Sequence, residues 1–387
     1  RFGLGVSAAG DVNGDGYGDL VVGAYQYDNT FTDEGCIFVY AGTATGLVST
    51  PNWIVFGGQT GAGFGGSVST AGDVNGDGYS DVIAGAYGFD NGQTDEGKVF
   101  VYHGSPFGIS LIANWSAESN QNFAYYGISV STAGDVNGDG YSDVVIGSYL
   151  YDNGQTDEGA AFVYNGSVSG LSSVPGWIGE GNQNNASYGL SVHTAGDVNG
   201  DGYADIIVGA YLYDNGQADE GSAFIYKGSA AGLSASPYWT GESNQSGAAY
   251  GWSVCTAGDV NGDGYSDVLS GARFYDNGQN DEGRVYEYNG SPEGLSTNSN
   301  WSAESNLASS NFGLSVSSAG DVNGDGYNDV IIGAPYFDNG EVAEGRAFVY
   351  YGTSSGLSVS AGWTAEPNIA GANFGTSVST AGDVNDD

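Results

Sequence analysis

A nine-residue motif that returns at a fixed interval is the feature that most constrains the fold of this chain. In its commonest form the motif reads DVNGDGYSD, and its complete copies begin 62 residues apart, at Asp11, Asp73, Asp135, Asp197, Asp259 and Asp321. A fixed period of this size indicates a repeat architecture in which each unit is one supersecondary element. The unbroken period predicts a single repeat domain over residues 1–387, with repeats starting near residues 2, 64, 126, 188, 250 and 312 and a partial one at 374.

One repeat contains four predicted strands and no helical periodicity. In the third repeat, alternation of apolar and small polar residues predicts a strand at 126–134, and an apolar run predicts a buried strand at 144–151. A turn-rich segment with an Asn-Gly signal leads to a third strand at 160–167, and a fourth surrounds Trp177. We therefore expect an all-β fold, a β-propeller of about 62-residue four-stranded blades with six full repeats and the start of a seventh. A solenoid is the competing repeat fold, but its repeats are usually shorter.

Tryptophans recur at one phase of the repeat. A residue of this size at the same place in each unit is expected to pack between neighbouring sheets, with ligand contact as the alternative. The tryptophans in register are Trp53, Trp115, Trp177, Trp239, Trp301 and Trp363.

The charge balance excludes some partners and suggests a cation. The formal net charge is -40, with only six basic residues. Nucleic acid is therefore excluded as a partner, because phosphate binding needs clusters of Lys and Arg, and direct membrane insertion is not expected. A charge of this size repels itself, so we expect counter-ions that are built into the fold.

The repeated motif has the composition of a calcium loop. Calcium prefers six to eight hard oxygen ligands, and the motif places side-chain oxygens at positions 1, 3, 5 and 9 and a backbone carbonyl at position 7. Its glycines permit the positive φ that folds a loop around an ion. The alternative is an acidic Asx-turn hairpin without an ion. The predicted Ca²⁺ ligands, about one ion per complete repeat, are Asp11, Asn13, Asp15, Tyr17, Asp19, Asp73, Asn75, Asp77, Tyr79, Asp81, Asp135, Asn137, Asp139, Tyr141, Asp143, Asp197, Asn199, Asp201, Tyr203, Asp205, Asp259, Asn261, Asp263, Tyr265, Asp267, Asp321, Asn323, Asp325, Tyr327 and Asp329.

Two short signatures flank this loop in every repeat. A Phe-Gly or Tyr-Gly pair precedes it, as at Phe64-Gly65, and a triplet such as GAY at 85–87 or GAP at 333–335 follows. Over the whole chain this pattern resembles the FG-GAP repeat of integrin α-subunit heads and their bacterial and fungal relatives. The resemblance implies a propeller, commonly seven-bladed, with calcium in the hairpin loops on one face. Only one repeat has the literal GAP.

A second acidic segment, DNGQTDEG in its commonest form, always retains its last glutamate. The carboxylate is expected to accept backbone N–H bonds within a hairpin, and a second ion site is the alternative. In the sixth repeat the preceding Asp is replaced by Ala343, so an ion site would fail there first. The glutamates are Glu34, Glu96, Glu158, Glu220, Glu282 and Glu344.

The two ends of the chain duplicate each other. Residues 373–387 align with residues 1–15, and Asp386 replaces a loop glycine. We expect a portion of a longer array, with seven blades as the leading parent. An open stack that forms filaments is the alternative.

These observations favour a binding protein over an enzyme. His103 and His193 lie at unrelated phases, and no nucleophile elbow, zinc spacing or phosphate loop is present. The leading hypothesis is a calcium-stabilised extracellular or cell-surface adhesion module whose partner is a protein or a glycan. A multivalent calcium-dependent lectin is one alternative, in which Tyr87, Tyr149 and Tyr211 stack on sugars unless they are core residues. A structural surface or filament protein that self-assembles through its repeats is another.

Overall fold

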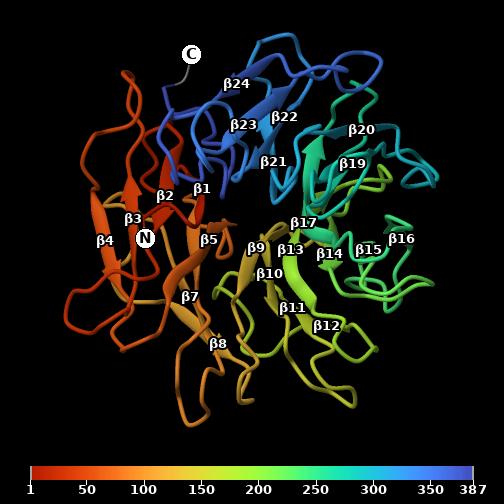
Figure 1. Cartoon of the computed structure of the whole chain (residues 1–387). Helices are drawn as coiled ribbons and strands as arrows, with labels where there is room; N and C mark the ends of the chain where they lie inside the picture. Colours follow the sequence, from red (N-terminus) through yellow and green to blue (C-terminus); the bar gives the residue numbers. More distant parts are fainter. Residues whose placement is uncertain (1, 386–387) are drawn as a thin grey trace. The chain divides into compact units, whose positions relative to one another are not determined.

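The computed structural model describes residues 2–385, and its regular elements are all β-strands. The strands form six antiparallel sheets of four, and within each sheet neighbours in sequence are neighbours in space (Figure 1). This confirms the predicted all-β fold of the propeller class, built from four-stranded blades. Each sheet is called a blade here and is numbered along the chain. Between residues 2 and 385 no helix has the length and apolar character needed to cross a membrane.

The strands of each blade keep nearly the same bounds relative to the repeat. Blades 1 to 3 consist of β1 (Val6–Gly10), β2 (Asp19–Gly23), β3 (Cys36–Tyr40) and β4 (Trp53–Phe56); β5 (Phe64–Gly72), β6 (Asp81–Ala86), β7 (Lys98–Tyr102) and β8 (Trp115–Glu118); β9 (Ser129–Gly134), β10 (Asp143–Ser148), β11 (Ala160–Tyr164) and β12 (Trp177–Glu180). Blades 4 to 6 consist of β13 (Tyr188–Gly196), β14 (Asp205–Ala210), β15 (Ser222–Tyr226) and β16 (Trp239–Glu242); β17 (Tyr250–Gly258), β18 (Asp267–Ala272), β19 (Arg284–Tyr288) and β20 (Trp301–Glu304); β21 (Ser315–Gly320), β22 (Asp329–Ala334), β23 (Arg346–Tyr350) and β24 (Trp363–Ala365).

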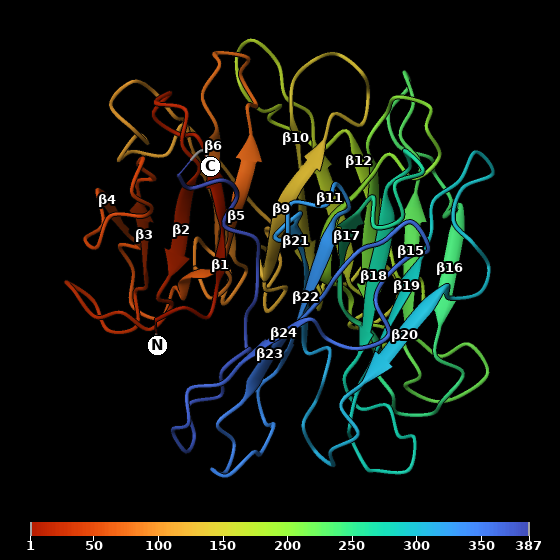
Figure 2. The same cartoon turned by 90° about the horizontal axis from the view of Figure 1, so that it is seen from above.

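The chain divides into two compact units, each with its own packed blades. One contains residues up to Val192 together with Ala230–Gly232 and the stretch from Ala381, and the other contains His193–Ser229 and Leu233–Thr380. Figure 2 shows strands β17, β18, β19 and β20 of one blade following one another across their sheet. The second strand of a blade is covered on both faces, and all six residues of β10 are buried. This explains why the second strands are continuous apolar runs rather than alternating ones.

The two glycine signatures mark a close backbone contact between successive blades. A Cβ on Gly85 of blade 2 would lie 1.9 Å from the carbonyl oxygen of Gly127 in blade 3. The same 1.9 Å approach separates Gly147 of blade 3 from the Gly189 carbonyl. Only glycine fits at a position where the neighbouring backbone occupies the place of a side chain. The aromatic residue of the preceding signature is buried beside this contact, as Phe64 and Tyr126 show.

The tryptophans in register join one blade to the next, which confirms packing for four of them. The indole N–H of Trp301 in blade 5 donates to the Ser358 carbonyl of blade 6 at 2.9 Å, and the ring lies edge-on to Tyr350. Trp363 of blade 6 is 48% exposed. The equivalent bonds run from Trp53 to Phe107, Trp115 to Ser172 and Trp239 to Ser296.

The start of the seventh repeat forms no strand among the described residues. The backbone carbonyl of Asp383 accepts the Gly18 N–H at 2.7 Å, and that of Val384 accepts the Thr43 N–H at 3.1 Å. In the same way, the backbone carbonyl of Asp11 accepts the N–H of Ser80 in blade 2. Asp383 therefore contacts blade 1 as Asp11 contacts blade 2. Asp386 lies outside the described residues.

Candidate metal-binding loops

The predicted loop between the first and second strands of a blade is held by its own acidic side chains. In blade 2, Asp73 Oδ1 accepts the N–H groups of Gly76 and Asp77 at 2.7 and 3.1 Å, and Oδ2 accepts that of Gly78 at 2.8 Å. Asn75 Oδ1 accepts the Asp77 N–H at 2.9 Å, and Asp77 Oδ1 accepts the Tyr79 N–H at 3.1 Å. Successive Asx turns therefore direct three side chains toward one short loop. The bond from position 6 to position 1 recurs in all six loops.

The aspartate at position 9 has a different environment. Asp81 is fully buried, and its two carboxylate oxygens accept the N–H groups of Val74 and Gly104, both at 2.9 Å. Val74 belongs to the loop and Gly104 follows β7, so this carboxylate ties the loop to the third strand of its own blade. The same two bonds are made by Asp19, Asp143, Asp205, Asp267 and Asp329.

Burial raises the pKa of these aspartates above the ordinary value of 3.8. The pKa of Asp81 rises to about 7, chiefly through burial; the two backbone N–H bonds lower it, and the neighbouring Asp77 and Asp73 raise it again. The other position-9 aspartates have raised pKa values too, because each is buried, accepts two backbone N–H bonds and lies near two other aspartates of its loop. The pKa reaches about 6 for Asp19 and Asp143 and about 7 for Asp205 and Asp267, and it is also raised for Asp329.

These shifts predict an unusual pH dependence in chelator. A carboxyl whose pKa is higher in the folded protein than in the unfolded one contributes stability that is full below pH 3.8 and is lost as the pH rises through 6 to 7. Without divalent ions the chain should therefore have a higher unfolding temperature at pH 5 than at pH 8. With calcium the order should reverse, because ligation requires ionised carboxylates. Thermal scans at both pH values measure this, and a metal-free protein that is more stable at pH 8 would contradict it.

Tyrosine at position 7 has a role that the sequence did not reveal. The loop pattern predicts only its carbonyl as a ligand, whereas in the structure its ring packs on the loop of the preceding blade. A Cβ on Gly14 would lie 2.5 Å from Tyr79 Cε1, and one on Gly76 would lie 2.6 Å from Tyr141 Cε1. Glycine at position 4 is thus required by the neighbouring ring. The loops of blades 1 and 2, 2 and 3, 4 and 5, and 5 and 6 are in direct contact in this way, so the order of one loop supports its neighbour.

The donor set of the loop fits a hard cation. The side chains at positions 1, 3, 5 and 9 offer only oxygen, and each carboxylate oxygen that accepts one N–H keeps a further lone pair. The glycine at position 6, with φ near 90°, has open space around it, as at Gly78. Within residues 2–385, no three acidic, histidine or cysteine side chains converge as the ligands of one metal ion. Calcium in these loops therefore stays a prediction.

The second acidic segment is a hairpin held by its glutamate. Glu34 Oε1 accepts three backbone N–H groups, from Asn29, Thr30 and Phe31, and Oε2 accepts a fourth from Gly58. The glutamate is buried in every blade. These contacts favour the hairpin interpretation over a second ion site. In blade 6 the hairpin keeps its form without the preceding aspartate, since Ala343 has the same positive φ of about 50° as the aspartates elsewhere.

The tyrosines considered for sugar stacking contact other aromatic rings. Tyr87 and Tyr149 are half-buried on either side of Tyr125, with ring centroids 6.3 and 5.8 Å away. Tyr211 lies edge-on to Trp252 at 4.7 Å. Each of these tyrosine rings packs against another aromatic ring of the protein, which favours a packing role over stacking on sugars.

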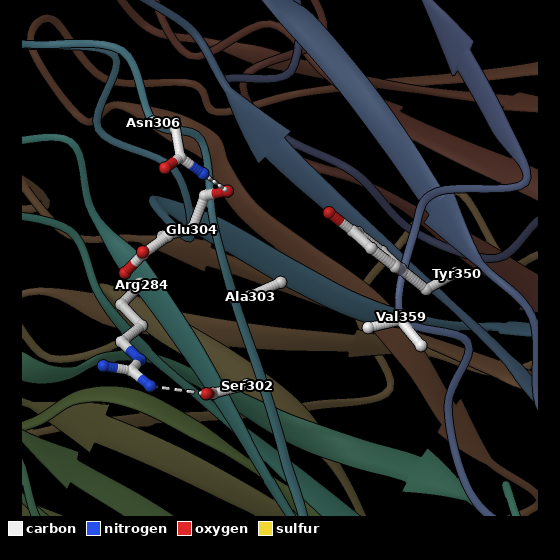
Figure 3. Close-up of a pocket in the computed structure, with 7 residues that line it drawn as sticks. All are labelled: Arg284, Ser302, Ala303, Glu304, Asn306, Tyr350 and Val359. Atoms are coloured by element: carbon white, nitrogen blue, oxygen red, sulfur yellow. Dashed lines mark hydrogen bonds between the residues drawn. The ribbon is translucent and has the colours of Figure 1, made fainter.

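A shallow pocket of about 230 Å³ lies between blades 5 and 6. Figure 3 shows Arg284 donating to Ser302 and Asn306 donating to the Glu304 backbone, beside Tyr350 and Val359. Its volume is below the roughly 300 Å³ typical of small-molecule sites. One Glu304 carboxylate oxygen also accepts from the Asn277 side-chain amide, so part of the polar lining is engaged within the protein.

Comparison with known proteins identifies the repeat. The profile of the FG-GAP repeat matches six segments that together cover more than half of the chain: residues 2–45, 64–102, 126–164, 188–226, 250–288 and 312–350. The chain is 32% identical over 245 residues to integrin alpha-5 of Xenopus laevis, which covers 61% of this chain and 22% of that protein. It is 36% identical over 157 residues to integrin alpha-4 of the same species, covering 39% of this chain and 15% of that protein. The chain thus spans less than a quarter of these relatives.

Among solved structures, rhamnogalacturonan lyase YesW is similar over 93% of this chain and 58% of that chain, with 14% identity and a TM-score of 0.46. Similarity at this level carries no information about activity.

Proposed function

The chain belongs to the FG-GAP repeat family, and we propose that residues 1–387 act as one calcium-stabilised binding module of the kind used in adhesion outside cells. The similarity to integrin alpha subunits supports a binding role over catalysis. The single observation that carries the calcium proposal is the loop itself, which repeats one all-oxygen donor set six times. The partner is a surface protein or a glycan.

The proposed ligands of each ion are the side chains at positions 1, 3, 5 and 9 with the carbonyl at position 7, as in Asp73, Asn75, Asp77, Asp81 and Tyr79 of blade 2. A bound ion would offset the repulsion between the three carboxylates and stabilise the loop. Because the loops within blades 1 to 3 and within blades 4 to 6 touch their neighbours through this tyrosine, calcium would stabilise neighbouring loops together. Affinities of extracellular calcium modules are about 10⁻⁴ to 10⁻³ M, which suits a calcium-rich exterior.

The binding role is tested by applying the purified chain to arrays of extracellular proteins and of glycans, with millimolar calcium and with excess chelator. The matched control is Asp77→Ala, which removes one exposed loop carboxylate. Calcium-dependent binding to a protein supports the adhesion module, and binding to a defined sugar supports the lectin alternative. No binding in either condition by a folded, calcium-loaded protein would contradict a binding role and favour a structural repeat protein.

A further inference from the structure

Blade 5 places a carboxylate where the other blades have an aliphatic core residue. Glu287 in β19 is fully buried and pairs across the sheet with Leu269 and Trp301. Its side chain stands in a position that the hydrophobic core fills elsewhere. The residues at this position in the other blades are Val39, Val101, Val163, Ile225 and Val349.

Glu287 is connected to the acidic loop of its own blade through two amides. With its amide nitrogen toward the carboxylate, Asn289 donates to Oε1 and Oε2 of Glu287 at 2.5 and 3.3 Å. The oxygen of Asn289 then accepts the Asn261 Nδ2 hydrogen at 2.6 Å. Asn261 is position 3 of the loop, and its Oδ1 accepts the Asp263 N–H at 2.8 Å. A continuous chain of hydrogen bonds therefore joins a buried carboxylate to a predicted calcium ligand.

Blade 2 offers a comparison. There His103 takes the place of Asn289, and its Nδ1 lies 3.1 Å from Asn75 Nδ2. The counterpart of Glu287 in blade 2 is Val101, so this contact ends at the imidazole. The orientation of the position-3 amide is thus supported in both blades, but only blade 5 adds a buried carboxyl group behind it.

We infer that Glu287 is a positioning residue that makes the loop at 259–267 the tightest divalent-cation site of the chain. Through Asn289 it holds the Asn261 amide so that Oδ1 faces the loop. Burial raises the pKa of Glu287 to about 9, with two aspartates of the loop adding to the effect, so a cation bound in the loop favours the ionised carboxylate and is attracted by it in return. A buried carboxylate without a nearby cation is costly, whereas a bound ion offsets that cost. The inference rests on the proposed calcium role of the loops.

The test is a calcium titration, followed by calorimetry, of the wild-type chain and three variants. Glu287→Val restores the aliphatic residue of the other blades, Glu287→Gln keeps an acceptor but removes the charge, and Glu293→Gln removes one charge at an exposed position of the same blade. We expect one site of the wild type to bind about tenfold more tightly than the rest, a factor that corresponds to about 1.4 kcal/mol. Both Glu287 variants should lose that difference, and Glu293→Gln should keep it.

A stability measurement in chelator separates this role from a purely structural one. Without calcium, Glu287→Val should be at least as stable as the wild type, because it replaces a buried polar carboxyl group by an aliphatic side chain. If the wild type binds calcium and both Glu287 variants have the same calcium titration curve as the wild type, the inference is wrong and the proposed function stands. If wild type binds no calcium at all, the proposed function fails, and the inference fails with it.

Discussion

Replacing Trp301 by alanine should lower the free energy of unfolding by about 2–4 kcal/mol, somewhat less than the roughly 3–5 kcal/mol for a fully buried tryptophan, because the ring is partly buried. The ring is packed edge-on against Tyr350 with centroids 4.9 Å apart, and its N–H donates to the Ser358 carbonyl. The substitution therefore opens a cavity at the junction of blades 5 and 6 and leaves that carbonyl without its donor. Urea denaturation followed by circular dichroism measures the change.

The chain supplies its own control for this prediction. Trp363 occupies the same repeat position in blade 6 but is 48% exposed. Trp363→Ala should cost no more than about 1 kcal/mol, because most of its surface is already in water. Equal losses for the two variants would show that the tryptophans do not act by joining successive blades.

Replacing Asp81 by alanine should destabilise the chain by about 2–5 kcal/mol even in chelator. The substitution leaves the buried N–H groups of Val74 and Gly104 unpaired, and each such group costs about 1–3 kcal/mol. Asp81→Asn should lose less, since its amide oxygen can still accept one of the two bonds. Denaturation in chelator isolates this structural role from any bound ion.

The exposed Asp77 of the same loop is the matched comparison. It accepts the Tyr79 N–H and one bond from the Asn75 amide, both at the exposed surface where water can replace them. Asp77→Ala should therefore cost about 1 kcal/mol or less in chelator while removing one bound calcium. A loss for Asp81→Ala that vanishes in chelator would contradict the structural role of position 9 and assign its whole effect to the ion.

The fold was predictable because its pattern is local and is repeated six times. Strand alternation, the apolar second strand and the turn signals each depend on neighbours in sequence, and the structure confirms four strands per blade. The role of Glu34 as an acceptor of hairpin N–H groups was predictable for the same reason. Residues 374–385 carry the same pattern as a first strand but form none, because a strand also needs a partner to pair with.

The contacts that the sequence could not reveal join residues that are distant in sequence, 23 positions apart within one blade and 65 apart between two blades. Spacing within the loop made Asp81 look equivalent to Asp73, but its burial depends on Gly104 from another turn of the blade. The packing of Tyr79 on Gly14 likewise depends on how one blade meets the next. Nothing in a single repeat distinguishes Glu287, since its setting becomes visible only when the core positions of all six blades are compared.

The measurement that tests the central claim most directly is the number of calcium ions bound per chain. Equilibrium dialysis at saturating free calcium, after removal of all bound metal, should give six ions, one for each complete loop. Each of the six variants that replaces a position-5 aspartate by alanine should lower that number by one. A folded chain that binds no calcium at millimolar concentration would contradict the account and leave the loops as Asx-turn hairpins.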